Sequence, residues 1–312
     1  MRGVWTLLPL FLGFPLWAAK YADEVWSFGN QASYLALGSA GVAVVQGPAA
    51  LDWNVAGLAG TPGSHALGFL HGSYFGGLHT TDHLAWATPR LLGENTWLGV
   101  GMYLFQSPGI KLTELSQPDD SLGEDNPPVV REEVAYRSMA FKLGFARRLH
   151  GVQAGLLLKL LYQNAGVETA YGLGLDLGIQ WSSFPWSFGL TVHNPLPTPL
   201  FWSTGTREWL VPSLVLGGAV GSEGLRILLD LETHMENYGD AAALALGPLS
   251  LDLHVGAEWR PHPAVSLRAG LDRGNPTLGG GLRYRGLTLD YAFMGHADLK
   301  NSHRVSLALW LP

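Results

Sequence analysis

Apolar and polar residues alternate along much of the C-terminal half of the chain. Every second residue from Leu249 to Trp259 is apolar, and the residues between them are Ser, Asp, His, Gly and Glu. Segments 225–234, 265–273 and 287–295 follow the same pattern. A period of two is typical of a β-strand with one apolar and one polar face. We therefore predict strands in all four segments.

The same test along the whole chain predicts about fourteen strands. They cover 64–71, 79–88, 96–105, 134–148, 152–163, 169–181, 186–193, 212–220, 225–234, 249–259, 265–273, 277–285, 287–295 and 303–311. Connections after even-numbered strands are mostly short, whereas 106–133, 194–211 and 235–248, which follow odd-numbered strands, are long. A soluble sandwich also alternates, but this parity of loop lengths is typical of outer-membrane barrels. The predicted fold is all-β, a transmembrane antiparallel β-barrel of about fourteen strands.

The composition agrees with a barrel whose outer surface faces lipid. Only 14% of the residues are charged, against about a quarter in soluble domains, while 47% are hydrophobic. The formal net charge is −6, and the absence of a basic footprint argues against a nucleic-acid partner. The chain has no cysteine, which excludes disulfides, thiolate metal sites and a cysteine nucleophile. An ordinary cytosolic enzyme is disfavoured, and no cofactor is implied.

The N-terminus has the pattern of a secretory signal peptide. Arg2 supplies the positive start, and an uncharged, mostly apolar run ends at Ala18-Ala19. A membrane anchor is the alternative, although the run is short for a spanning helix and contains two prolines. The expected location is the outer membrane of a diderm bacterium. The predicted regions are a signal peptide at 1–19, a periplasmic lead-in and N-terminal plug at 20–60, and the outer-membrane barrel at 61–312.

Residues 35–60 differ from everything that follows them. They are rich in small residues, short of charge and without a sustained period of two. We interpret this segment as a compact plug inside the barrel, with a short helix near 47–52. The alternative is a poorly ordered leader before the first strand. The candidate plug residues are Gly38, Gly41, Asp52, Trp53, Asn54 and Gly57.

This segment also carries a family resemblance. The stretch GSAGVAVVQGPAALDWNVAGLAG (38–60) resembles the N-terminal hatch of FadL-like outer-membrane proteins, particularly the PorV/PorQ branch. Members commonly have Trp or Tyr, then Asn-Pro-Ala-Gly-Leu, and here Val55 replaces the proline. Further stretches similar to the branch are YGLGLDLGIQW (171–181), HVGAEWRP (254–261), VSLRAGLDRG (265–274), TLGGGLRYRGLTLDYAF (277–293) and HRVSLALWL (303–311).

The resemblance implies a fourteen-stranded barrel with a plug, and it leaves two functions open. FadL-type members pass hydrophobic compounds such as fatty acids across the outer membrane. PorV-type members receive secreted proteins at the type IX translocon and act as a platform rather than a transporter. The implied partners are therefore outer-membrane lipid, a hydrophobic small molecule or secretion-system subunits, together with the barrel-assembly machinery during biogenesis.

The polar faces of segments 225–234 and 249–259 hold the densest group of charges. A register that places His234 opposite Ser250 also places Glu232 opposite Asp252, Asp230 opposite His254 and Arg226 opposite Glu258. Opposite charges that face each other across strands are stabilising. We expect a structural polar network in the lumen, with ligand-linked or proton-linked gating and a divalent cation site as alternatives. The network residues are Arg226, Asp230, Glu232, His234, Asp252, His254, Glu258, Arg268 and Asp290.

Three further features complete the sequence-based expectations. Ser73 lies near several histidines but lacks a nucleophile motif, so catalysis is not expected. The acidic, proline-containing segment 106–133 is expected to be a solvated external loop, with surface cation binding as an alternative. Tryptophans near predicted strand ends suit the aromatic girdles of a membrane barrel, with packing in the core as the alternative; they are Trp97, Trp181, Trp186, Trp202, Trp209, Trp259 and Trp310.

Overall fold

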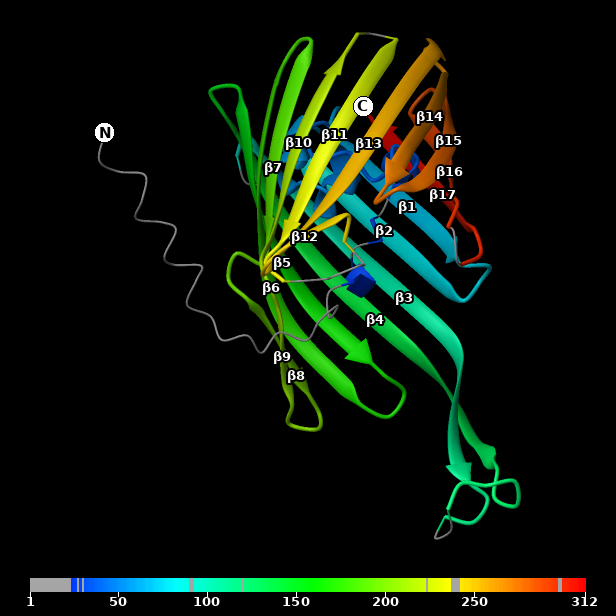
Figure 1. Ribbon diagram of the computed structural model, residues 1–312. Helices are drawn as coiled ribbons and strands as arrows, with labels where there is room; N and C mark the ends of the chain where they lie inside the picture. The colour runs from blue at the N-terminus through cyan, green and yellow to red at the C-terminus, as the bar shows by residue number, and fades with distance from the viewer. Residues whose placement is uncertain are drawn as a thin grey trace.

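The chain forms one antiparallel sheet that closes on itself (Figure 1). The computed structural model describes residues 24–26, 28–29, 31–89, 93–118, 121–222, 224–236, 242–296 and 299–312. The predicted signal peptide lies outside these residues. Closure occurs at β1 (His65–Tyr74), which pairs with β2 (His79–Pro89) on one side and with β17 (Ser302–Leu311) on the other. The wall is a closed barrel of fourteen strands, as predicted.

The strand positions agree closely with the alternation pattern. The other wall strands are β3 (Thr96–Leu115), β4 (Pro128–Leu149), β5 (Val152–Asn164), β6 (Thr169–Ser183), β7 (Trp186–His193), β10 (Ser213–Gly221), β11 (Leu225–His234), β13 (Leu249–His262), β14 (Val265–Asp272), β15 (Asn275–Tyr284) and β16 (Leu287–Met294). Three short strands that the pattern did not predict lie in connections; they are β8 (Thr198–Trp202), β9 (Arg207–Leu210) and β12 (Leu244–Leu246).

The two ends of the barrel differ in their connections. At one end, which we call the turn end, β4 and β5 are joined by residues 150–151, β13 and β14 by 263–264, and β15 and β16 by 285–286. The C-terminus lies at the same end, because β17 ends there. The opposite loop end carries longer connections, including the β8–β9 hairpin between β7 and β10. The parity of loop lengths seen in the sequence is therefore real.

The expectation of a solvated loop at 106–133 is wrong. Most of this segment is β-strand, because β3 and β4 stay paired as far as Leu115 and Pro128. The long hairpin projects beyond the other strands at the loop end (Figure 1). Apolar residues such as Ile110 and Val130 favour strand here, and the ladder tolerates the intervening Pro108-Gly109 through an irregularity between Ser107 and Ile110.

The two faces of the wall have opposite character. Along β11, the outward residues Leu225, Ile227 and Leu229 are each 50% exposed, whereas the inward Asp230 is 1% exposed. Large apolar side chains are thus spread over the exterior of the wall, and charged ones such as Asp230 and Arg268 are enclosed by it, which is the reverse of a soluble sandwich. Within the described residues, no helix combines the length and the apolar character needed to cross a membrane.

Residues 31–60 lie inside the barrel (Figure 1). We call residues 31–60 the inner segment. It contains α1 (Ala32–Leu35) and two 3₁₀ helices, η3 (Gly47–Leu51) and η4 (Val55–Gly60), and it is preceded by η2 (Glu24–Trp26). The predicted short helix near 47–52 is therefore present. Leu51 and Leu58 are almost completely buried and pack in one cluster with wall residues such as Leu157, so the main core lies between the inner segment and the wall.

The tryptophans divide between two environments. Trp181, Trp186 and Trp259 are at least 40% exposed near the turn end, as a girdle requires. Trp97 packs instead against the core around the inner segment. The ring of Trp310 lies against Gly47, where a Cβ would approach it to 2.5 Å. The girdle prediction is wrong for these last two, because both occupy inward positions of their strands.

Candidate functional site

The lumen is the candidate site, and its first feature is the attachment of the inner segment to β11. The backbone N–H groups of Gly41 and Val42 both donate to one carboxylate oxygen of Asp230, at 2.7 and 2.9 Å. Asp230 is almost completely buried. A buried carboxylate is stabilised by such donors, and hydrogen bonds to a charged acceptor are stronger than neutral ones. Asp230 therefore anchors the middle of the inner segment to the wall.

A second attachment is made by Gly38, whose backbone contacts β15 and β13. Its N–H donates to the hydroxyl of Thr277 at 3.0 Å, and that hydroxyl lies 3.0 Å from the carbonyl of Ala36. The Gly38 carbonyl lies 3.1 Å from Nδ1 of His254. Gly38 has φ +66°, and a Cβ there would lie 2.4 Å from the carbonyl oxygen of Leu271. Only glycine fits this backbone conformation and this close approach.

Asn54 joins the inner segment to β6, three strands along the wall from β11. Its amide nitrogen donates to the carbonyl of Val42 at 3.0 Å and to that of Ile179, on β6, at 2.9 Å. Its side-chain oxygen accepts from the N–H of Ala56 at 3.1 Å and so caps η4. The side chain is 1% exposed, so its hydrogen bonds form away from water.

The remaining candidates of the inner segment also make wall or internal contacts. Asp52 forms a buried ion pair with Lys142 of β4 and lies 3.8 Å from Nδ1 of His83. The carbonyl of Trp53 accepts from the hydroxyl of Thr191 at 3.0 Å. Gly57 packs directly against the backbone of the inner segment, where a Cβ would lie 2.2 Å from the carbonyl oxygen of Val45. The inner segment is thus tied to strands all round the barrel.

The pairing of β11 with β13 has the register considered in the sequence. Arg226 faces Glu258, Asp230 faces His254, Glu232 faces Asp252 and His234 faces Ser250. Only some of these facing residues touch each other. Several charged side chains instead bind a residue diagonally opposite on the partner strand, or a residue on another strand.

His254 shows how the charges are shared. Its Nε2 lies 3.3 Å from Glu232 and its Nδ1 lies 3.0 Å from Asp272, so it joins β11, β13 and β14. His234 lies 3.5 Å from Glu232 and 3.8 Å from Asp252. Among the described residues, no group of three or more His, Asp or Glu side chains is arranged to hold a metal ion.

Arg268 links the network to β16. Its Nε donates to Glu258 at 2.8 Å and its Nη1 donates to Asp290 at 2.7 Å. Asp290 also accepts from the side chain of Gln31 at 3.3 Å, which reaches it from the start of the inner segment. All nine predicted network residues point into the lumen. Arg226, however, forms no ion pair with any of the described residues.

A cavity of about 480 Å³ lies on the loop-end side of the inner segment. Leu51 and Trp53 of the segment line it, together with wall residues such as Leu161 and Met294. An aromatic cluster adjoins it, in which the ring of Phe28 stacks on Phe105 at 5.6 Å. Its lining also holds four carboxylates, four Lys or Arg side chains and four histidines; they are Asp52, Asp176, Glu232, Asp272, Lys142, Lys159, Arg273, Arg304, His193, His234, His254 and His296.

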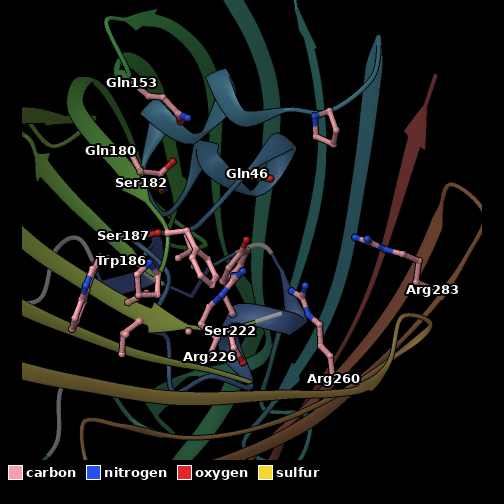
Figure 2. Close-up of a pocket in the computed structure, with 18 of the residues that line it drawn as sticks. Gln46, Gln153, Gln180, Ser182, Trp186, Ser187, Ser222, Arg226, Arg260 and Arg283 are labelled. Atoms are coloured by element: carbon pink, nitrogen blue, oxygen red, sulfur yellow. The ribbon is translucent and has the colours of Figure 1, made fainter. Parts of the chain in front are cut away.

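A second cavity, of about 680 Å³, lies on the turn-end side (Figure 2). Tyr34, Val44 and Gln46 of the inner segment line it, so the segment separates the two cavities. Burial raises the pKa of Tyr34 to about 12, which keeps its phenol neutral. The other lining residues come mostly from the ends of wall strands and from turns.

Sequence reasoning missed several lumen residues on β4–β6. Lys159 donates to Asp176 at 2.6 Å and to Asn194 at 2.9 Å, and Lys142 binds Asp52. The available signal was a lone charge at an inward position of an otherwise apolar strand, as in LLLKLL around Lys159. A lysine there needs an acidic partner facing the same lumen.

The fold and the lumen define a class: a closed antiparallel barrel with an apolar exterior and an internal N-terminal segment. Solved structures similar to it include the Pseudomonas putida toluene transporter TodX, with TM-score 0.62 and 13% identity over 91% of this chain and 98% of that one. Others are the CymD monoaromatic hydrocarbon channel (TM-score 0.61, 13% identity, 91% and 98%) and a Pseudomonas aeruginosa FadL homologue (0.60, 10%, 91% and 99%). The first two are described as a transporter and a channel.

At these identities the likeness shows the fold alone. The FadL homologue agrees with the FadL-like part of the resemblance, and the neighbours do not bear on the PorV/PorQ branch. No protein-family model matches the sequence, and no curated protein is significantly similar to it.

Proposed function

We propose that this chain is an outer-membrane barrel through which small hydrophobic compounds pass, and that the inner segment acts as its plug. The observation that carries the proposal is the position of the segment between two cavities, where it is hydrogen-bonded to the wall at β11 through Asp230 and at β6 through Asn54. The belt of exposed Leu, Val and aromatic residues supports a lipid-facing exterior. The loop end would then be extracellular and the turn end periplasmic.

The loop-end cavity is the proposed entry site for the hydrophobic compound. Its apolar wall and the adjoining aromatic cluster around Phe28 and Phe105 offer the surface that an uncharged ring or chain would bury. Several of the charges that line it are already paired, as in Lys142 with Asp52 and Lys159 with Asp176, so an uncharged ligand need not separate them. The solved neighbours described as toluene and monoaromatic hydrocarbon channels support this choice of ligand class.

The test is uptake of radiolabelled toluene by cells of a diderm host that lacks such a channel and expresses this chain with a signal peptide. Ala140 lines the loop-end cavity and is fully buried, so Ala140→Phe places a ring in the proposed entry site. Ala269→Phe is the matched control, because Ala269 is exposed on the outward face of β14. Retained heat-modifiable gel migration confirms that each variant forms a barrel.

We expect uptake to rise with the wild-type chain, to fall strongly with Ala140→Phe, and to stay high with Ala269→Phe. Uptake equal to that of the empty host, with a folded barrel in the outer membrane, would contradict transport. Copurification of large secretion subunits in that case would favour the platform function that the sequence left open.

A further inference from the structure

The turn-end cavity carries an unbalanced positive charge. Its charged lining residues are all arginines: Arg226 of β11, Arg260 of β13, Arg283 of β15 and Arg285 of the following turn. Figure 2 shows the side chains of Arg226, Arg260 and Arg283 turned toward the same space. The chain as a whole has a net charge of −6, so this excess is local.

The carboxylates close to these arginines are already engaged. Glu258 accepts from Arg260 at 2.6 Å and from Arg268 at 2.8 Å. Asp290 accepts from Arg268. In the described parts of the chain, neither Arg226 nor Arg283 forms an ion pair with these carboxylates. The guanidinium of Arg285 lies 5.2 Å from the ring centre of the exposed Tyr284. With the small adjoining cavity included, the other four guanidinium groups meet two carboxylates, which leaves two positive charges in excess.

Two buried polar groups belong to the lining of these cavities. The indole N–H of Trp310 and the hydroxyl of Thr288 are buried without a hydrogen-bond partner among the described residues. Trp310 lines both the main and the small cavity. A buried donor without an acceptor is costly, and a bound oxyanion with several lone pairs would satisfy it. The loop-end cavity, in contrast, has four carboxylates in its own lining.

We propose that the turn-end cavity is a binding site for a phosphate group, either of a soluble phosphorylated molecule or of a lipid headgroup at the rim of the barrel. The guanidinium fork binds phosphate oxygens in pairs. A phosphate monoester carries up to two negative charges, so it offsets more of the excess than a single carboxylate does. The cavity of about 680 Å³ is larger than a phosphate, and Val44 and Val220 provide an apolar wall for an attached organic group.

The inference does not depend on transport, and binding to the purified full-length barrel tests it. Isothermal titration in an uncharged detergent uses glycerol 3-phosphate as the soluble probe and acetate as the carboxylate comparison. Nanodiscs of phosphatidylcholine with and without phosphatidic acid provide the lipid arm, read as the number of phosphatidic acid molecules that remain with the protein after exchange into detergent. The variants are Arg226→Gln/Arg283→Gln, Arg226→Lys/Arg283→Lys and the control Arg131→Gln, which lies in the exposed β3–β4 hairpin.

We expect phosphate affinity to weaken with added salt and to drop about tenfold or more in the double glutamine variant. The double lysine variant should recover part of it, and Arg131→Gln should match the wild type. Binding of glycerol 3-phosphate would identify a soluble ligand, and retention of phosphatidic acid alone would identify a lipid headgroup. Absence of binding in both arms, equal affinity for acetate, or a folded double glutamine variant with unchanged affinity would overturn the proposal.

Discussion

Replacing Asp230 should release the inner segment from the barrel wall. In Asp230→Ala, the N–H groups of Gly41 and Val42 lose their common acceptor and remain in a buried site. In Asp230→Asn, an uncharged oxygen remains to accept hydrogen bonds. The expected order of segment release is therefore alanine, then asparagine, then wild type.

The magnitude follows from the two hydrogen bonds. A hydrogen bond to a charged acceptor contributes about 1.5–3 kcal/mol, so the pair contributes at least about 3 kcal/mol to docking of the segment. This corresponds to about a hundredfold increase in the undocked fraction for Asp230→Ala. Asp230→Asn loses only the charge contribution, about 1–2 kcal/mol, or about a tenfold increase.

The natural absence of cysteine makes the assay simple. Ala40 is completely buried one residue before the anchored pair, so a thiol in Ala40→Cys reacts with a maleimide only when the segment leaves the wall. The labelling rate should rise about a hundredfold when Asp230→Ala is added to Ala40→Cys. Asp125→Ala, in the distant hairpin, controls for loss of a carboxylate. An unchanged rate in a barrel that retains heat-modifiable migration would refute the anchoring role of Asp230.

Three further predictions concern the same packing. Asn54→Asp should destabilise the barrel more than Asn54→Ala, because the carboxylate would face the carbonyls of Val42 and Ile179. The temperature at which the folded gel band is lost measures the two stabilities, and a lower temperature for Asn54→Ala would contradict the prediction. Gly189→Ala should cost about 1–3 kcal/mol, since its Cβ would lie 2.2 Å from the carbonyl oxygen of Val42, whereas Gly218→Ala, with its nearest atom at 4.0 Å, should be neutral in denaturant unfolding. Lys142→Met leaves Asp52 buried without its ion-pair partner and should cost about 3–5 kcal/mol; adding Asp52→Asn should recover most of it, and additive losses in the double variant would argue against the pair.

The wall of the barrel was predictable because its information is local. Alternation shows directly which residues of β11 and β13 face the lumen, and the short turns limit how neighbouring strands can pair. This is why the register that joins Arg226 to Glu258 and Asp230 to His254 could be written down from the sequence. The hairpin beyond Ser107 was missed because its acidic residues and prolines hid short apolar runs that still favour strand.

The contacts of the inner segment could not be predicted in the same way. The link between Asp230 and the backbone of Gly41 and Val42 joins residues far apart in the chain, and no periodicity records which carboxylate meets which turn. The same holds for Asp52 and Lys142. Trp97 and Trp310 were misplaced because proximity to a strand end does not say which face of the strand the side chain occupies.

The central claim is that the inner segment closes a lumen that is otherwise open. Barrels of sixteen to eighteen strands leave a water-filled channel, while eight strands leave none, so fourteen strands emptied of residues 38–57 should leave a pore. The direct measurement is ion conductance of the purified barrel in planar bilayers, with deletion of Gly38–Gly57 compared with the wild type. We predict stable ion-conducting steps for the deletion and none for the wild type. A folded, heat-modifiable deletion barrel that stays closed to ions would contradict the account.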